Sequence, residues 1–371
     1  MEIFFTEALR RLPDDAAFRI INAARPGTDY LLNTILPERP MRSYEVSNGT
    51  IEVKSAMPGL VGLDSPYPPT GAMTAATFLE RTAKVANQVT MSEHALRELQ
   101  NMALYVRAIG NDSIEQLVQE VLNFIDAVIV QPHLDVAEWL RGQALATGEI
   151  NWQYGNVSMV VNYNIPATNK LPARTGNNAY GGSTSKFWDD IRAQNRLLRG
   201  ASRIIRIIHP DLLDNVIYND VNALQVASVT NGIMTLRRYQ TVGGAIVPTS
   251  DARDVIEVIP YGMEGEIIDP ANPTQTIRVP FWPRTKMVAI GTGVARGYMV
   301  GSGSRPQSDV ELGYTHLAPT VESGGAPGRW SRVYTPPDRP WQLVGQGVSN
   351  VLPVIHADAV TRIVIATSDV S

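Results

Sequence analysis

Three side chains that could move protons or bind a metal lie close together in the sequence: His133, Asp135 and Glu138. Their chemistry would be general acid–base catalysis or zinc binding. Residues two or five positions apart do not share a helix face, and a helical zinc site needs two histidines one turn apart. Because His133 cannot join the two acids on one face, we interpret all three as the exposed polar side of a long helix.

Two other patterns resemble catalytic or nucleotide-binding motifs. Gly291, Gly293 and Gly297 follow an apolar run, but their spacing is one residue too long for a dinucleotide-binding loop and no helical pattern follows them. Ser183 and Lys186 match the S-x-x-K spacing of acyl-transfer enzymes, but the partner motifs S-D-N and K-T-G do not occur. We interpret the first pattern as a turn between strands and the second as the loop before a helix.

The remaining reactive residues form no constellation. The sequence has no cysteine, which excludes disulfides, thiolate zinc sites and cysteine nucleophiles. The histidines stand singly, and the acids form no pair with an evident role. We therefore predict that the protein is not an enzyme and that it has no catalytic, cofactor-binding or metal-binding residues. The five histidines are His94, His133, His209, His316 and His356.

The composition favours broad contacts over a charged binding surface. Charged residues make up 18% of 371, below the usual quarter, which suggests extensive contact with partners. The net charge of −4 argues against binding by phosphate neutralisation, although not against enclosing nucleic acid. The first residues lack the pattern of a signal peptide, and no apolar run could span a membrane. We expect a soluble intracellular protein without membrane contact.

A long helix is the clearest predicted element. Apolar residues recur every three or four positions from Ile114 to Ile129, which predicts a helix over 113–147, about 50 Å long. Gly148 should end the helix, and Pro132 should kink it. The elements predicted after it are a hairpin over 149–166, a loop over 167–186, a helix over 187–199, a strand over 203–208, a helix opening at Pro210, strands within 254–291 and a β-rich tail over 351–367.

The first part of the chain is predicted to be extended. Residues 1–43 contain no long periodic element, so we interpret them as an arm that needs another surface to be ordered. Asn48-Gly49 between two β-favouring runs predicts a hairpin turn. The following segment, up to Thr74, is a long loop with four prolines, and its apolar residues favour docking onto a neighbour over disorder.

The order of these parts resembles the major capsid proteins of tailed phages, specifically the lambda capsid protein E family with the Hong Kong 97 fold. Four local sequences carry the resemblance. They correspond to the loop before the peripheral domain, the end of the long helix, the first axial helix and the returning tail. In that order they are GLDSPYPPTGAMT (62–74), AEWLRGQALATGEI (137–150), FWDDIRAQNRLLR (187–199) and LPVIHADAV (352–360).

The resemblance implies an α+β fold of the Hong Kong 97 type with a defined domain plan. The parts it implies are an N-terminal arm (1–43), an E-loop (44–90), a peripheral domain with a spine helix and a sheet (91–186, spine 113–147), an axial domain (187–335) and a return to the peripheral domain (336–371). The residues implied to contact neighbouring subunits are Tyr44, Lys54, Leu60, Leu63, Tyr67 and Met73.

The resemblance also implies a function and partners. The chain would assemble with itself into hexamers and pentamers of an icosahedral virion shell that encloses double-stranded DNA without binding it specifically. A separate scaffolding protein, a portal and a decoration protein would be its partners, and assembly would take place in the host cytoplasm. A lysine–asparagine cross-link through Lys54 or Lys84 is less expected than non-covalent cementing by a decoration protein.

Other functions stay open on the sequence alone. An encapsulin-like compartment shares the shell architecture and differs in its cargo. An α/β enzyme with an unrecognised site predicts a defined small oligomer with a ligand pocket, whereas a shell protein predicts large closed particles. A tail-tube or other virion component is a further possibility.

Overall fold

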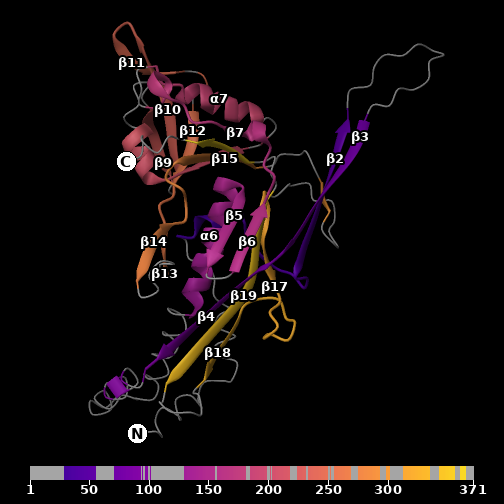
Figure 1. Cartoon of the computed structure of the whole chain (residues 1–371). Coiled ribbons are helices and arrows are strands. Elements are labelled where there is room, and N and C mark those ends of the chain that lie inside the picture. The colour runs from indigo at the N-terminus through magenta and orange to yellow at the C-terminus, as the bar shows by residue number, and fades with distance from the viewer. Residues whose placement is uncertain are drawn as a thin grey trace, which may run out of the picture. The chain divides into compact units, whose positions relative to one another are not determined.

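The structure is a computed structural model, and it describes most of the chain outside the two termini and several internal stretches. The described residues are 29–55, 71–92, 94, 97–98, 101, 129–154, 157–180, 184–198, 201, 203–217, 224–230, 233–249, 251, 255–268, 275–292, 298–300, 312–334, 342–355 and 360–364. Helices and sheets both occur, so the predicted α+β class is confirmed (Figure 1).

The chain divides into two compact units. Unit 1 comprises 1–44, 81–140 and 315–353, and unit 2 comprises 45–80, 141–314 and 354–371. The division falls within helix α6 (Gln131–Thr147) and within strand β19 (Leu343–Ile355).

Unit 1 is built on a five-stranded sheet. Its order is β1-β17-β19-β18, and β4 pairs antiparallel with β19. Helix α3 (Leu31–Ile35) contributes fully buried Leu32 to the core, and the first half of α6 contributes Leu134 and Leu140. The strands other than β19 are β1 (Glu38–Pro40), β4 (Ala83–Met91), β17 (Gly313–Ala318) and β18 (Trp330–Tyr334).

Unit 2 contains an eight-stranded mixed sheet. The order is β11-β10-β12-β8-β15-β20-β7, and β9 pairs with β10. The strands are β7 (Lys170–Leu171), β8 (Arg203–Ile208), β9 (Leu224–Thr230), β10 (Ile233–Val242), β11 (Ala245–Pro248), β12 (Val255–Pro260), β15 (Lys286–Thr292) and β20 (Val360–Val364).

Helix α7 (Phe187–Leu197) covers this sheet. Its apolar positions follow the helical period, so Phe187 and Ile191 lie in one core with Ile208, Val258 and Met287 of the strands. The short elements nearby are the 3-10 turns η2 (Ala167–Asn169) and η3 (Gly176–Asn178), helix α8 (Pro210–Leu212) and the π turn η4 (Leu213–Ile217).

Three further sheets of unit 2 have only two or three strands. They are the ribbon β16-β2-β3, the hairpin β5–β6 and the hairpin β13–β14. Their strands are β2 (Glu45–Ser55), β3 (Gly71–Arg81), β16 (Tyr298–Val300), β5 (Glu149–Tyr154), β6 (Val157–Asn162), β13 (Glu264–Ile268) and β14 (Thr276–Pro280).

The predicted turn at Asn48-Gly49 is wrong. Strand β2 runs without interruption through both residues, and Gly49 pairs with Val300 of β16. The Asn-Gly signal assumes that the two flanking β runs pair with each other. Here β2 pairs instead with β16 and with β3, the next strand along the chain. We call β2 and β3, with the residues that join them, the long hairpin; residues 56–70 lie outside the described residues.

The predicted long helix is only partly within the described residues. Helix α6 covers 131–147, a π turn precedes it at 129–130, and 113–128 lie outside the described residues. Pro132 is the second residue of α6 and directly follows the change from π to α geometry. Gly148 ends the helix with φ +68°, as predicted.

Several shorter predictions are confirmed. The hairpin over 149–166 is β5–β6, the helix over 187–199 is α7, and the strand over 203–208 is β8. Pro210 opens α8, and the tail contributes β19 and β20. Ser185 Oγ accepts a hydrogen bond from the Phe187 amide at 3.3 Å, which fits the loop interpretation of the Ser183–Lys186 motif.

Gly148→Ala should destabilise the protein through both backbone and side-chain strain. A Cβ at this position would lie 2.5 Å from Cδ1 of buried Ile165, and its φ disfavours any L residue. Gly176 has a similar φ of +62° with no atom within 4 Å of an added Cβ, so Gly176→Ala isolates the backbone part. Urea unfolding should show a loss of about 1 kcal/mol for Gly176→Ala and at least about 1 kcal/mol more for Gly148→Ala. Equal losses would show that Ile165 relaxes without cost.

Candidate functional site

The long hairpin starts and ends at one point of unit 1. The Thr82 amide and the Thr82 hydroxyl both donate to the Tyr44 carbonyl, each at 3.2 Å. His316 Nε2 donates to the neighbouring carbonyl of Ser43 at 2.9 Å. We call Ser43, Tyr44, Thr82 and His316 the hairpin root. Tyr44 precedes β2 and Thr82 follows β3, so the root joins the segment that leads into the hairpin to the segment that leads out of it.

The segment leading into the root is held along β17. Strand β1 pairs parallel with β17, and the Thr315 amide donates to the Pro37 carbonyl at 2.9 Å. The buried Thr315 hydroxyl donates to the Leu36 carbonyl at 2.8 Å. On the other side of β1, the Met41 amide donates to the Leu317 carbonyl at 2.9 Å. These bonds fix the register of the segment on β17, and therefore the position of Tyr44 at its end.

Helix α6 holds the beginning of the same segment through two acids. The Glu138 carboxylate is fully buried and accepts from the Leu32 amide at 2.7 Å. Asp135 accepts from the Tyr30 hydroxyl at 2.7 Å. Burial raises the pKa of Asp135, while burial and the nearby Asp135 charge raise the pKa of Tyr30. Tyr30 therefore stays a neutral donor, and the acids of α6 serve as fixed acceptors for an otherwise distant segment.

His133 lies on the opposite face of α6, in contact with the sheet. Its Nδ1 lies 2.8 Å from Ser349 Oγ and its Nε2 lies 3.0 Å from Asn87 Oδ1. An imidazole that donates from Nε2 and accepts at Nδ1 is neutral. Burial, with the charge of Arg329 as a second cause, lowers the pKa of His133 to about 4. The ring is therefore an uncharged bridge between β4 and β19.

The predicted exposure of this cluster is wrong. His133 and Glu138 are both buried and Asp135 is half-buried, because the segment 30–36 covers one face of α6 and the sheet covers the other. The spacing argument itself holds, since His133 and the two acids contact different elements. The helical periodicity of α6 could not indicate that a segment about 100 residues earlier in the chain covers one of its faces.

Close packing and a buried ion pair complete the arrangement. A Cβ on Gly347 would lie 2.6 Å from Ile129 Cγ2 and 2.7 Å from His133 Nε2, so only glycine permits this approach of β19 to α6. Arg329 is buried and forms an ion pair with Glu38 of β1. Loss of either partner would leave a buried charge uncompensated, so the pair ties β1 to the strand region before β18.

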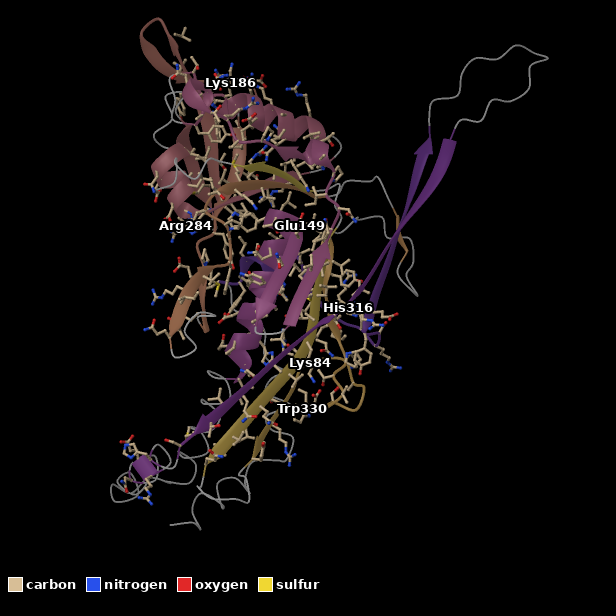
Figure 2. All side chains as sticks on the ribbon, in the orientation of Figure 1. Lys84, Glu149, Lys186, Arg284, His316 and Trp330 are labelled. Atoms are coloured by element: carbon tan, nitrogen blue, oxygen red, sulfur yellow. The ribbon has the colours of Figure 1, made fainter. Side chains whose placement is uncertain are left out.

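Lys84 lies on the exposed edge of the sheet. Its Nζ is 2.6 Å from Glu322 Oε1, and the hydrogen bond from Lys84 lowers the pKa of Glu322 (Figure 2). The side chains of β4 alternate between exposed and half-buried, with Lys84 among the exposed ones. The Lys84 side chain is therefore bound within the subunit by Glu322.

Only some of the residues predicted to contact neighbouring subunits lie within the described part of the chain. Tyr44 is an exposed member of the hairpin root. Lys54 lies on β2 and Met73 lies on β3. These two strands are neighbours in the sheet of the long hairpin. Leu60, Leu63 and Tyr67 lie outside the described residues. The root residues Thr82 and His316 could not be predicted from the sequence, because their role depends on pairing between segments far apart in the chain.

No described group of histidines and acids could hold a metal ion. Among the described helices, none is long and apolar enough to cross a membrane. The polar groups described above bond to other segments of the chain.

Comparison with known proteins identifies one sequence family and several solved structures. The sequence model of the family described as phage major capsid protein E matches residues 19–300. No curated protein matches the sequence.

Among solved structures, the chain is similar to a protein assigned as a capsid protein of a prophage of Escherichia coli CFT073. The identity is 11%, the TM-score is 0.50, and 96% of this chain and 99% of the other are covered. The capsid of a native GTA particle gives 8% identity, TM-score 0.45 and coverages of 93% and 92%. The holo-SrpI encapsulin complex of Synechococcus elongatus PCC 7942 gives 12% identity, TM-score 0.43 and coverages of 95% and 95%.

Mild acid should destabilise the fold through His133. Its pKa is about 4 in the folded chain and about 6.5 when unfolded, so the unfolded state binds more protons between these values. The stability contribution is complete above pH 6.5 and is lost as the pH falls, by about 2 kcal/mol at pH 5. Urea unfolding at pH 7 and pH 5 measures this loss.

The contribution of His133 can be separated from that of the other histidines. His209 and His316 also have lowered pKa values and add to the acid sensitivity. The variant His133→Gln should reduce the difference between pH 7 and pH 5 by about 2 kcal/mol, whatever its effect at pH 7. His94→Gln, at an exposed position, is the control and should leave the difference unchanged. An unchanged difference in His133→Gln would contradict the assignment.

Proposed function

Because this chain belongs to the phage major capsid protein E family, we propose that its copies assemble into hexamers and pentamers of an icosahedral head around double-stranded DNA. The protein is a phage major capsid protein with the α+β fold of the Hong Kong 97 type. It is thus a structural protein of this family, and the family match favours a phage shell over the compartment and tail-tube alternatives.

The long hairpin is the observation that carries the assembly proposal. Strands β2 and β3 have 11 residues each, which corresponds to about 36 Å of extended chain. Their sheet has only one further strand, the three-residue β16. A ribbon of this size buries too little apolar surface to be stable alone and needs a partner surface. In a shell, that surface belongs to a neighbouring copy.

The hairpin root explains why such a hairpin can act between subunits. Both of its ends are bonded to a core that α6, β17 and the 30–44 segment form together. The segments that lead into and out of the hairpin are thus held together within one subunit. We propose Tyr44, Lys54, Leu60, Leu63, Tyr67 and Met73 as its contact residues.

The domain plan is proposed on the same basis. An arm over 1–43, a peripheral domain over 91–186 with a spine helix, an axial domain over 187–335 and a return over 336–371 fit the order of elements. We place the end of the E-loop at Thr82 rather than at residue 90, because β4 pairs with β19 over nine residues in the sheet of unit 1.

The charge balance supports a shell that encloses DNA without binding it. The 36 acids exceed the 32 lysines and arginines. Tight binding to DNA would require clusters of positive charge that release counterions from phosphates. We propose, from the resemblance, a separate scaffolding protein, a portal and a decoration protein as partners, and assembly in the host cytoplasm before the protein resides in the virion.

Deleting the end of the long hairpin should separate folding from assembly. We expect a variant with residues 56–70 replaced by a four-residue Gly/Ser linker to keep the circular dichroism spectrum and a melting temperature close to those of the full chain. It should form no closed shells when expressed with a scaffolding protein. Negative-stain electron microscopy and size-exclusion chromatography measure the outcome.

The full chain, expressed and purified in parallel, is the positive control. A second control, Val321→Ser, changes an exposed apolar residue elsewhere in the chain and should assemble normally. Normal shells from the deletion variant would contradict the role of the hairpin. A full chain that forms only a small, defined oligomer under all conditions would contradict the shell function itself.

A further inference from the structure

Two segments of unit 2 meet at the end of strand β8. The Tyr261 amide donates to the Ile208 carbonyl at 2.8 Å. The next residue, Gly262, packs so closely on Pro210 that an added Cβ would lie 2.8 Å from the Pro210 Cγ. The residues that lead into β13 are therefore held against the start of α8.

The β13–β14 hairpin is attached to this region at its base. Phe281 follows β14, and its amide donates to the Met263 carbonyl at 3.0 Å. The Phe281 ring lies against Gly265, where an added Cβ would be 2.5 Å from Cε1. Further out, Ile277 of β14 is exposed, and the two strands pair with no other described strand. Because a two-stranded hairpin is only marginally stable alone, its order depends on the contacts at its base.

Four ionisable side chains reinforce this base. Arg284, labelled in Figure 2, lies in the turn between β14 and β15. Its Nη2 is 3.5 Å from Glu264 Oε1 of β13, and its Nε is 3.3 Å from Asp211 Oδ2 of α8. The same Asp211 oxygen lies 3.5 Å from Nδ1 of His209, which is buried directly after β8. One carboxylate oxygen thus lies between two groups that can each carry a positive charge.

The protonation state of His209 determines which contact its Nδ1 can make. Nδ1 accepts a hydrogen bond from the Asp211 amide at 3.2 Å, so the neutral ring carries its proton on Nε2. A second proton must therefore bind Nδ1. An N–H at Nδ1 can no longer accept from the amide, and the nearby acceptor for it is Asp211 Oδ2. Nε2 is buried without an acceptor among the described residues, so the change in bonding is confined to Nδ1.

We propose that His209, Asp211 and Arg284 form a proton-sensitive link that holds the β13–β14 hairpin to α8. With a neutral His209, the Asp211 carboxylate binds Arg284, and Arg284 binds Glu264 at the start of β13. When a proton from solvent binds Nδ1, the imidazolium takes the Asp211 carboxylate and repels the adjacent guanidinium. Half of the Arg284 side chain is exposed, so it can turn into water, and β13 then loses its link to α8.

The charges around His209 determine the direction of the response. Burial lowers the pKa of His209, the Asp211 carboxylate opposes this shift, Arg284 adds to it and Glu264 opposes it. These three side chains face the ring from α8, from the turn after β14 and from β13. Because the pKa in the folded chain is below its ordinary value, the link persists at neutral pH and is lost as the pH falls through the folded pKa. The inference concerns a single subunit and does not depend on the shell function.

Hydrogen–deuterium exchange of the full chain measures the release of the hairpin. Mass spectrometry should compare pH 7 with the lowest pH at which circular dichroism shows a folded chain. After correction for the intrinsic pH dependence of exchange, the amides of 264–268 and 276–280 should exchange about threefold faster in acid, because one partly exposed ion-pair link is lost. The increase should reverse when the pH is restored.

Three variants separate this link from general acid destabilisation. His209→Asn keeps an acceptor for the Asp211 amide but cannot bind a proton, so its hairpin should exchange equally at both pH values. Arg284→Gln breaks the link at every pH, so its hairpin should exchange at pH 7 as fast as wild type does in acid. Arg278→Gln removes the same charge from an exposed arginine of β14 and should keep the wild-type ratio between the two pH values.

Exchange of the imidazole C2 hydrogen reports the pKa of each histidine separately. Arg284→Gln should raise the pKa of His209, because a repelling charge is removed, and Asp211→Asn should lower it. Arg278→Gln should leave it unchanged. The inference is overturned if the hairpin of His209→Asn responds to acid like wild type, or if Arg284→Gln leaves the pKa of His209 unchanged.

Discussion

The two buried faces of α6 are the constraint on which unit 1 depends. One face holds the 30–36 segment through Glu138 and Asp135, and the other holds β4 and β19 through His133. Each of these groups would be costly to bury alone, and each is hydrogen-bonded. A rotation of the helix would leave several of them without partners at once. The polar contacts thus specify one arrangement of helix, segment and sheet, while the apolar residues around them supply most of the burial energy.

The same constraint determines how the hairpin root is built. The segment held by α6 continues as β1, then as the root, and then as β2. A residue added anywhere between Leu32 and Tyr44 would break the pairing with β17 or displace the root. Hydrogen bonds between segments far apart in the chain therefore determine where the chain enters and leaves the hairpin.

Elements whose determinants are local could be predicted from the sequence. Helix α7 follows from the spacing of Phe187 and Ile191, and the end of α6 follows from Gly148. The assignment of His133 and Glu138 to the surface failed because helical periodicity describes one helix and not the segments that cover it. The turn at Asn48-Gly49 failed for a related reason, since β2 pairs with strands far away in the sequence. The root residues are visible only when distant segments are brought together.

Thr82 is the only residue between β3 and β4, and both of its donors are committed to the Tyr44 carbonyl. Side chains of a strand alternate between faces, so a single inserted residue in β2 or β3 would turn every residue beyond it to the opposite face. Related proteins that keep this junction should consequently differ in hairpin length by an even number of residues in each strand. Evolution of shell geometry in this lineage would then proceed by such paired insertions and deletions, with the junction itself left intact.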